Sequence, residues 1–137
     1  YINSVLANAK MLAETLKNNG FKIYSGGTDT HLMLVDLRPF NVKGNIASDS
    51  LSRANITCNK NGIPFDTESP MITSGIRLGT PAATTRGFKN QEFKLVGQLI
   101  TKVIKGLSEN PKNNSKIEKE VQKEVISLCS AFPIYSE

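Results

Sequence analysis

The sequence predicts an α/β domain built as a two-layer sandwich, with a small mixed or antiparallel sheet and helices packed mainly on one of its faces. Three long segments carry apolar residues at every third or fourth position and therefore indicate helices, at residues 1–19, 90–107 and 115–132. Short apolar stretches bounded by glycine, proline and asparagine lie between them and are typical of strands and turns. Helices that alternate with short strands favour this architecture.

Length and composition indicate one globular domain. The chain has 137 residues, of which 39% are hydrophobic, and this is enough for a single core. We expect one domain over residues 1–137, with 1–19 as a connecting helix and 20–137 as the α/β domain proper. No apolar run approaches the roughly 20 residues that a membrane span needs, so no membrane association is expected.

Charge and cysteine spacing argue against two further classes of protein. The net charge is +5, but the basic residues are spread along the chain and alternate with glutamates in the last helix, so no nucleic-acid surface is expected. Cys58 and Cys129 lie far apart and form no CxxC pair, which argues against a metal site. Two free thiols suit a reducing cytoplasm.

The N-terminal third predicts a helix followed by a β-hairpin. The helix over 1–19 is expected to end at Gly20, because glycine readily adopts the left-handed conformation found after helices. Strands are predicted at 21–25 and 31–37, joined by a turn at 26–29. The single histidine, His31, stands at a strand start and is interpreted as a structural residue.

The middle of the chain predicts a loop, a short helix and a third strand. Residues 38–44 are expected to form the loop, and 46–54 the helix, with Asn45 as its cap and Ile46 facing inward. The third strand is predicted at 56–58. The following residues, 59–66, are rich in turn formers and side-chain amides.

Residues 69–85 contain the most informative stretch, SPMITSGIRLGTPAATT. Ser69-Pro70 predicts a turn, and residues 72–78 predict a buried strand. Thr80-Pro81 is typical of a helix start, and Gly87 is placed to end that short helix.

The C-terminal part predicts two helices separated by a linker at 110–114. The helix over 90–107 has the most regular apolar stripe in the chain. Ser115 and Glu118 have the spacing of a capping box, in which both side chains bond the first turn of the last helix, and Pro133 is expected to end it. Glu118 is also assigned to a solvated face of alternating lysines and glutamates.

Arg77 is the residue that points to a binding site, because a guanidinium between Ile76 and Leu78 is unusual in a buried strand. It could form a structural salt bridge or reach water at the sheet end. Alternatively it could clamp a carboxylate or phosphate, which its planar fork suits. The amide-rich turn at 59–66 would lie near Arg77 if both segments reach one edge of the sheet. No arrangement typical of a nucleophile, paired carboxylates, a phosphate loop or a metal accompanies them.

Three blocks of sequence resemble serine hydroxymethyltransferases, which move a hydroxymethyl group between serine and tetrahydrofolate with pyridoxal phosphate. The blocks are SGGTDTHLMLVDL at 25–37, RANITCNKNGIPFDTESPMITSGIRLGTPAATTRGF at 53–88 and CSAFPIY at 129–135. The resemblance covers essentially the whole chain, but it matches only the last third of such an enzyme. It implies the small C-terminal domain of a fold-type I pyridoxal-phosphate enzyme.

The resemblance also implies roles for individual residues. Arg77 matches the arginine that binds the α-carboxylate of serine or glycine. Asn61 is expected near the pteridine ring of tetrahydrofolate, and Ser69, Pro70 and Met71 at the folate's edge. Arg86 is expected to give structural support.

The rest of the catalytic apparatus is expected outside this chain. The resemblance places pyridoxal phosphate and its Schiff-base lysine in a preceding large domain, so no catalytic residue is expected here. The complete enzyme is expected to be a cytoplasmic homodimer in one-carbon metabolism, whereas this chain alone should be inactive and prone to self-association through its first helix.

Two alternatives stay open from the sequence. One is the small domain of another pyridoxal-phosphate enzyme, such as an aminotransferase or an aldolase, which would not need the folate-side loop. The other is a stand-alone amino-acid-binding or anion-binding regulatory domain with the same architecture.

Overall fold

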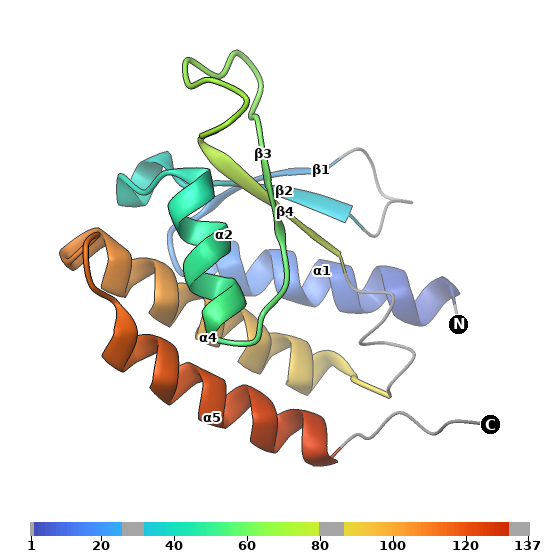
Figure 1. Cartoon of the computed structure of the whole chain (residues 1–137). Helices are drawn as coiled ribbons and strands as arrows, with labels where there is room; N and C mark the ends of the chain where they lie inside the picture. The colour runs from blue at the N-terminus through green and yellow to red at the C-terminus, as the bar shows by residue number, and fades with distance from the viewer. Residues whose placement is uncertain (1, 26–31, 80–86, 132–137) are drawn as a thin grey trace.

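The computed structural model describes residues 2–25, 32–79 and 87–131, and these form helices on one side of a single sheet (Figure 1). In chain order the elements are α1 (Ile2–Asn18), β1 (Lys22–Ser25), β2 (Leu32–Asp36), the 3-10 helix η1 (Arg38–Phe40), α2 (Gly44–Arg53), β3 (Asn59–Asn61), β4 (Gly75–Gly79), α4 (Asn90–Glu109) and α5 (Ser115–Ala131). The predicted fold class is therefore confirmed, and so are the two long helices predicted at 1–19 and 90–107.

The sheet has the strand order β1-β2-β4-β3, and every neighbouring pair is antiparallel. The predicted pairing of the first two strands is confirmed by the β1–β2 register, in which Ile23 lies opposite Val35. β4 is an inner strand, with β2 on one side and β3 on the other. The predicted turn at 26–29 and His31 lie outside the described residues.

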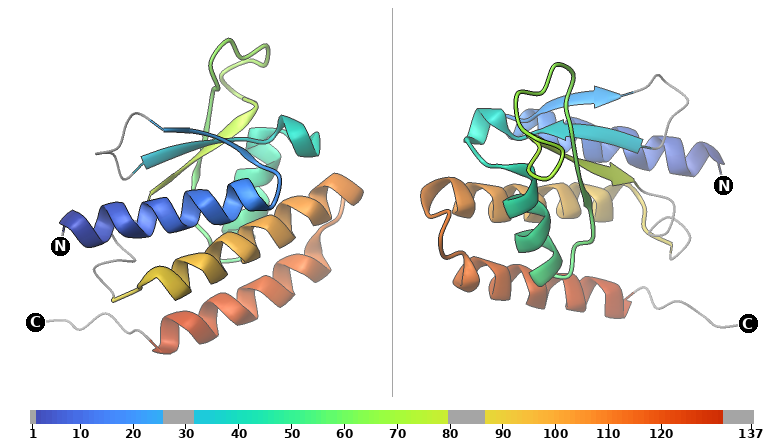
Figure 2. Two further views of the ribbon diagram at one scale, coloured as in Figure 1. Left: turned by 180° about the vertical axis from the view of Figure 1, so that it is seen from behind. Right: turned by 45° about the horizontal axis from the view of Figure 1, so that its top comes forward.

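The core lies between one face of the sheet and the layer formed by α1 and α4. Figure 2 shows these two helices side by side, with α5 beyond α4. The sheet contributes alternate residues of its two inner strands to this core, as expected for a strand with one buried face: Met33, Val35, Ile76 and Leu78. Gly97 lets α4 approach α1, because a Cβ atom there would lie 2.7 Å from Thr15 Cγ2.

The start of α2 differs from the prediction. The helix begins at Gly44 and its cap position is Lys43, so Asn45 lies inside the first turn and is not the cap. Instead, the backbone N–H of Gly44 donates to Thr73 O at 3.0 Å, and that of Asn45 donates to Ile72 O at 2.9 Å. Backbone carbonyls of a distant loop thus accept hydrogen bonds from the first N–H groups of α2, a role that the side chain of Asn45 was expected to fill. Ile46, predicted to face inward, is 37% exposed.

The third strand lies later in the chain than predicted. β3 covers Asn59–Asn61 and not 56–58, and β4 begins at Gly75 and not at 72. The sequence could not reveal this, because the strand limits depend on pairing: Asn59 lies opposite Arg77, and Asn61 opposite Gly75. The predicted loop at 38–44 contains η1, and the predicted helix start at Thr80-Pro81 lies outside the described residues.

The predicted capping box of the last helix is wrong. Glu118 is 6% exposed and its carboxylate contacts α2: it accepts hydrogen bonds from Ser50 Oγ at 2.5 Å and from Arg53 Nε and Nη2, each at 2.9 Å. Asn114 joins this cluster by donating from Nδ2 to Ser50 Oγ at 3.1 Å. The bonds from Arg53, together with the one from Ser50, hold the pKa of Glu118 below its usual range in spite of burial. Glu118 therefore joins α5 to α2 and does not belong to a solvated face.

Replacing Glu118 with Gln should lower the free energy of unfolding by about 1.5–3 kcal/mol at neutral pH, the typical contribution of hydrogen bonds to a charged group. The folded state lowers the pKa of Glu118. The difference in unfolding free energy between the unmodified chain and the Glu118→Gln variant should therefore be complete above the ordinary glutamate pKa of 4.5, and it should shrink as the pH falls through the lower pKa of the folded state. Urea unfolding at several pH values measures both effects.

The matched control is Glu120→Gln on the same helix. Glu120 pairs with Lys102 at 3.2 Å, and both side chains are more than two-fifths exposed, so the expected cost is about 0–1 kcal/mol. Equal costs for the two variants would contradict the structural role assigned to Glu118.

Candidate functional site

Arg77 lies on the face of the sheet opposite the helical core. Its neighbours in β4, Ile76 and Leu78, are buried, whereas Arg77 is exposed. Residues that lie directly opposite one another in an antiparallel pair share a face, so Leu34 of β2 and Asn59 of β3 flank Arg77 there. The strand alternation that buries two aliphatic residues therefore presents the guanidinium on the other side.

No ion pair to Arg77 is found among residues 2–25, 32–79 and 87–131, where the four salt bridges involve other cations. The structural salt bridge left open by the sequence is thus not seen in this part of the chain. An exposed guanidinium without an internal carboxylate partner can bind an external anion.

Arg38 provides a contrast at the end of β2. Its guanidinium donates from Nη2 to Asp36 Oδ2 at 2.7 Å and from Nε to Asp36 Oδ1 at 3.1 Å. Asp36 is 1% exposed, and although burial would raise its pKa, the bonds from Arg38 lower it overall. Arg38 is thus paired with a carboxylate of the fold, whereas Arg77 has no such ion pair among the described residues.

The sheet places Asn61 and Arg77 on one face. Asn61 lies two residues after Asn59 in β3, so it is a diagonal neighbour of Arg77, a relation that typically separates residues by about 7–8 Å. The side-chain amide of Asn61 donates to Gly62 O at 2.9 Å. The predicted proximity of the amide-rich turn to Arg77 is confirmed, but it arises because part of that turn is a strand.

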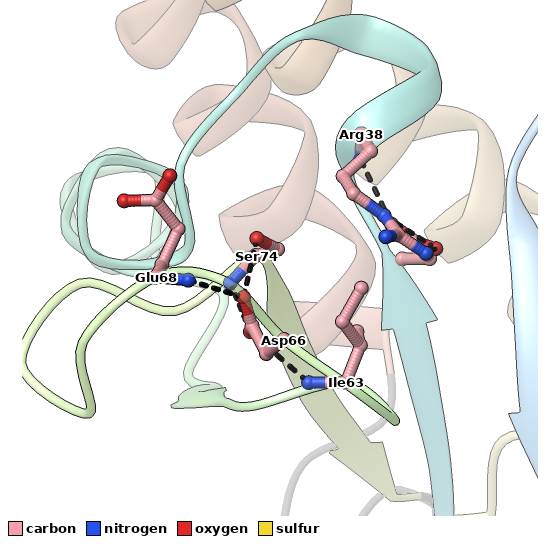
Figure 3. Close-up of polar contacts among 6 residues, drawn as sticks. Arg38, Ile63, Asp66, Glu68 and Ser74 are labelled. Carbon is pink, nitrogen blue, oxygen red and sulfur yellow. Dashed lines mark hydrogen bonds and ion pairs between the residues drawn. The ribbon is translucent and has the colours of Figure 1, made fainter.

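The loop between β3 and β4 projects beyond the sheet and is organised around Asp66 (Figures 1 and 3). Asp66 Oδ2 accepts from Ile63 N–H at 3.2 Å and from Ser74 N–H at 2.8 Å. Asp66 Oδ1 accepts from Glu68 N–H at 2.9 Å and from Ser74 Oγ at 2.8 Å. One carboxylate therefore joins the residues that enter this loop to the residues that leave it.

These bonds also determine the charge state of Asp66. Burial alone would raise the pKa of its carboxyl group, but donors from Glu68, Ser74 and Ile63 outweigh burial and lower the pKa to about 2. Asp66 is therefore ionised throughout the physiological pH range. Sequence reasoning included Asp66 only as a turn former; the available signal was that aspartate often accepts from the backbone two residues later, as it does here from Glu68.

The predicted folate-edge residues lie on the same loop. Ser69, Pro70 and Met71 are all exposed, and Met71 retains 76% of its accessible surface. Ser69 O accepts from the N–H groups of Ile72 and Thr73 at 3.0 and 2.9 Å, which closes this part of the loop into a turn. Figure 3 shows the base of the loop beside the end of β2.

Groups that could carry out covalent chemistry are not found in the described part of the site. Burial raises the pKa of Cys58 to about 12, so this thiol is a poor nucleophile. Every lysine in the described ranges is exposed, and none has the desolvated setting of a Schiff-base lysine. The same ranges contain no acidic, cysteine or histidine cluster able to hold a metal ion, and no helix in them could span a bilayer. Arg86 lies outside them.

Comparison with known proteins identifies the family of the chain. The family model for serine hydroxymethyltransferase matches residues 1–100. A relative described as "Serine hydroxymethyltransferase" from Pelagibacter ubique (strain HTCC1062) is 81% identical over 135 residues, which is 98% of this chain and 31% of the relative. "Serine hydroxymethyltransferase 3" from Colwellia psychrerythraea (strain 34H / ATCC BAA-681) is 61% identical over 136 residues, covering 99% of this chain and 32% of the relative.

The chain thus spans about a third of the length of the curated relatives that it matches. The family match extends over well over half of its residues and includes α1, the complete sheet and the loop organised by Asp66. The chain belongs to the serine hydroxymethyltransferase family.

Proposed function

We propose that this chain is the C-terminal, substrate-positioning part of a complete serine hydroxymethyltransferase, which transfers the hydroxymethyl group of serine to tetrahydrofolate and yields glycine and 5,10-methylenetetrahydrofolate. The observation that carries the proposal is Arg77, an exposed guanidinium on the open sheet face that has no ion pair within the described residues. Family membership supplies the reaction class.

Arg77 would bind the α-carboxylate of serine or glycine. Two parallel N–H donors match the two oxygens of a carboxylate, and this fixes the orientation of the amino acid as well as its position. β4 holds the backbone of Arg77 between two neighbouring strands, so the arginine is pre-positioned by the sheet. Its contribution to the reaction is therefore orientation, because a correctly placed substrate needs less entropy loss at the transition state.

The loop beside Arg77 would bind the folate. Asn61 can offer both a donor and an acceptor to a pteridine edge, and it shares a sheet face with Arg77. Ser69, Pro70 and Met71 would border the folate, because they are exposed on the same loop. An amino acid at Arg77 and a folate at this loop would then lie next to each other, as a transfer between them requires.

The described residues do not fit pyridoxal phosphate, because all their lysines are exposed. When bound, this cofactor acts as an electron sink for amino-acid chemistry. We assign its binding to a part of the complete enzyme outside this chain, and we likewise propose a cytoplasmic homodimer. The family match favours this enzyme over the small domain of an aminotransferase or aldolase; a stand-alone amino-acid-binding domain is an outcome that the experiments below would reveal.

Replacing Arg77 with Ala in the complete enzyme should weaken serine binding by about 100-fold, because hydrogen bonds to a charged group contribute about 1.5–3 kcal/mol and tenfold in affinity corresponds to about 1.4 kcal/mol. Arg77→Lys should restore only part of the affinity, since an ammonium lacks the bidentate fork. Calorimetric titration with serine measures both variants.

Lys60→Ala is the matched control for charge. Lys60 is an exposed cation on the adjacent strand, but its partner in register is Ile76, so it belongs to the opposite face. Serine affinity should not change in this variant. Near-normal serine affinity in Arg77→Ala would contradict the carboxylate assignment.

The isolated chain should bind glycine weakly at most and should catalyse no transfer, because it lacks a suitable lysine among its described residues. We also expect its average mass in light scattering to rise with concentration. Among residues whose exposure the structure describes, which in α1 are residues 6–18, the exposed large hydrophobics are Leu32, Ile46, Phe65, Met71 and Ile126, so the predicted contact through α1 stays a prediction. A monodisperse monomer, or turnover by the isolated chain, would contradict these expectations.

A further inference from the structure

The loop from Gly62 to Ser74 is ordered by polar bonds, because apolar packing along it is sparse. Ile63 is buried at its start, whereas Phe65 and Met71 remain 99% and 76% exposed. Such a segment cannot obtain its fixed conformation from the hydrophobic core. The source of its order must therefore lie in its hydrogen bonds.

The backbone of this loop adopts conformations that need support. Phe65 has φ 58° and Thr73 has φ 60°, both in the left-handed region that bulky and β-branched residues rarely occupy. Residues of this kind persist in that region only where surrounding contacts determine the conformation. Phe65 immediately precedes Asp66, and Thr73 immediately precedes Ser74, so each strained residue adjoins one partner of the Asp66–Ser74 contact.

Two sets of hydrogen bonds hold the loop: those that the Asp66 carboxylate accepts within the loop, and those that the start of α2 makes to it. The carboxylate accepts four hydrogen bonds from three residues, at distances of 2.8–3.2 Å. The first two N–H groups of α2 bond Thr73 O and Ile72 O, and Lys43 Nζ pairs with Glu68 Oε2 at 2.6 Å. The bonds from the start of α2 hold the end of the loop, and the Asp66 carboxylate, in addition to the β3–β4 pairing, joins its first residues to its last.

We propose that Asp66 is a positioning residue for the folate subsite, because its carboxylate fixes the loop that follows Asn61 and carries Ser69–Met71. This inference rests on the function proposed above. Asp66 need not contact the folate: it would act by keeping Ser69–Met71 in one arrangement before the ligand arrives. Such preorganisation raises affinity, because the loop loses less conformational freedom on binding.

The same geometry predicts that the effect is selective. Arg77 is held by β4 pairing with β2 and β3, and Asn61 by the same β3–β4 pairing, neither of which involves the Asp66 carboxylate; the folate contacts that depend on Asp66 are those of Ser69–Met71. Loss of the carboxylate should therefore disturb the folate side of the site and leave the amino-acid side largely intact. A residue with only a general structural role would lower both affinities together with stability.

Asp66→Asn is the decisive variant, because it preserves size and shape. An amide nitrogen accepts no hydrogen bond. With the nitrogen at the Oδ2 position, asparagine loses the bonds from Ile63 N–H and Ser74 N–H; with the nitrogen at the Oδ1 position, it loses the bond from Glu68 N–H, while the Ser74 hydroxyl can turn and accept from the amide. Ser74→Ala removes only the bond from Ser74 Oγ and should have a smaller effect in the same direction. Thr67→Ala, at an exposed position of the same loop, is the matched control.

The experiment uses the complete enzyme and calorimetry with two probes: tetrahydrofolate in the presence of saturating glycine, and serine in the absence of folate. For Asp66→Asn we expect tetrahydrofolate affinity to fall at least tenfold and serine affinity to change less than twofold. Amide hydrogen exchange should accelerate at Ile63, Glu68 and Ser74, but not in α4. Thr67→Ala should match the unmodified enzyme in every measurement.

Three results would overturn the inference. Unchanged tetrahydrofolate affinity in Asp66→Asn, with loop exchange accelerated, would show that loop order does not matter for the folate. Equal losses of serine and tetrahydrofolate affinity with a lower unfolding midpoint, repeated in the milder Ser74→Ala variant, would show a general structural role. Normal tetrahydrofolate affinity in an Asn61→Ala variant would reject the folate subsite itself, and thus part of the proposed function. If tetrahydrofolate affinity falls in Asn61→Ala but not in Asp66→Asn, only the role of Asp66 is rejected.

Discussion

The position of β4 between β2 and β3 is the constraint on which the rest of the structure depends. Its side chains alternate between the two faces, so burying Ile76 and Leu78 under the helices places Arg77 on the open face. A slip of one residue in register would bury the guanidinium and expose both aliphatic side chains. The hydrophobic core therefore fixes the orientation of the arginine without touching it.

Polar contacts extend this order from the core to the loop. Glu118 connects α5 to Ser50 and Arg53 on α2, and the first turn of α2 bonds the carbonyls of Ile72 and Thr73. A continuous series of contacts thus leads from the last helix to the β3–β4 loop. Bonds to the buried Glu118 carboxylate are costly to break, and the backbone bonds from α2 place a segment that buries little apolar surface.

The candidate site brings together polar groups suited to binding, and no reactive group for covalent chemistry is found beside them among the described residues. An exposed guanidinium and side-chain amides on β3 can form hydrogen bonds to a ligand, whereas Cys58 is a poor nucleophile and the lysines are solvated. This composition agrees with a chain that covers about a third of its relatives' length. The proposed function accordingly assigns the orientation of the substrates to this chain and the breaking of bonds to another part of the complete enzyme.

The sequence by itself determined the fold class, the long helices α1 and α4 and the β1–β2 pairing, and it singled out Arg77 as a candidate, because periodicity and a charged residue among aliphatic ones are local signals. Only the tertiary structure decided where β3 lies, that Glu118 bonds α2 and does not cap its own helix, and that Asp66 holds a loop together. The β3 pairing and the Glu118 bonds join residues far apart in sequence, whereas Asp66 bonds residues two to eight positions away that the fold of the loop brings to it. Such partners are selected by proximity in the folded chain, and apolar periodicity does not encode them.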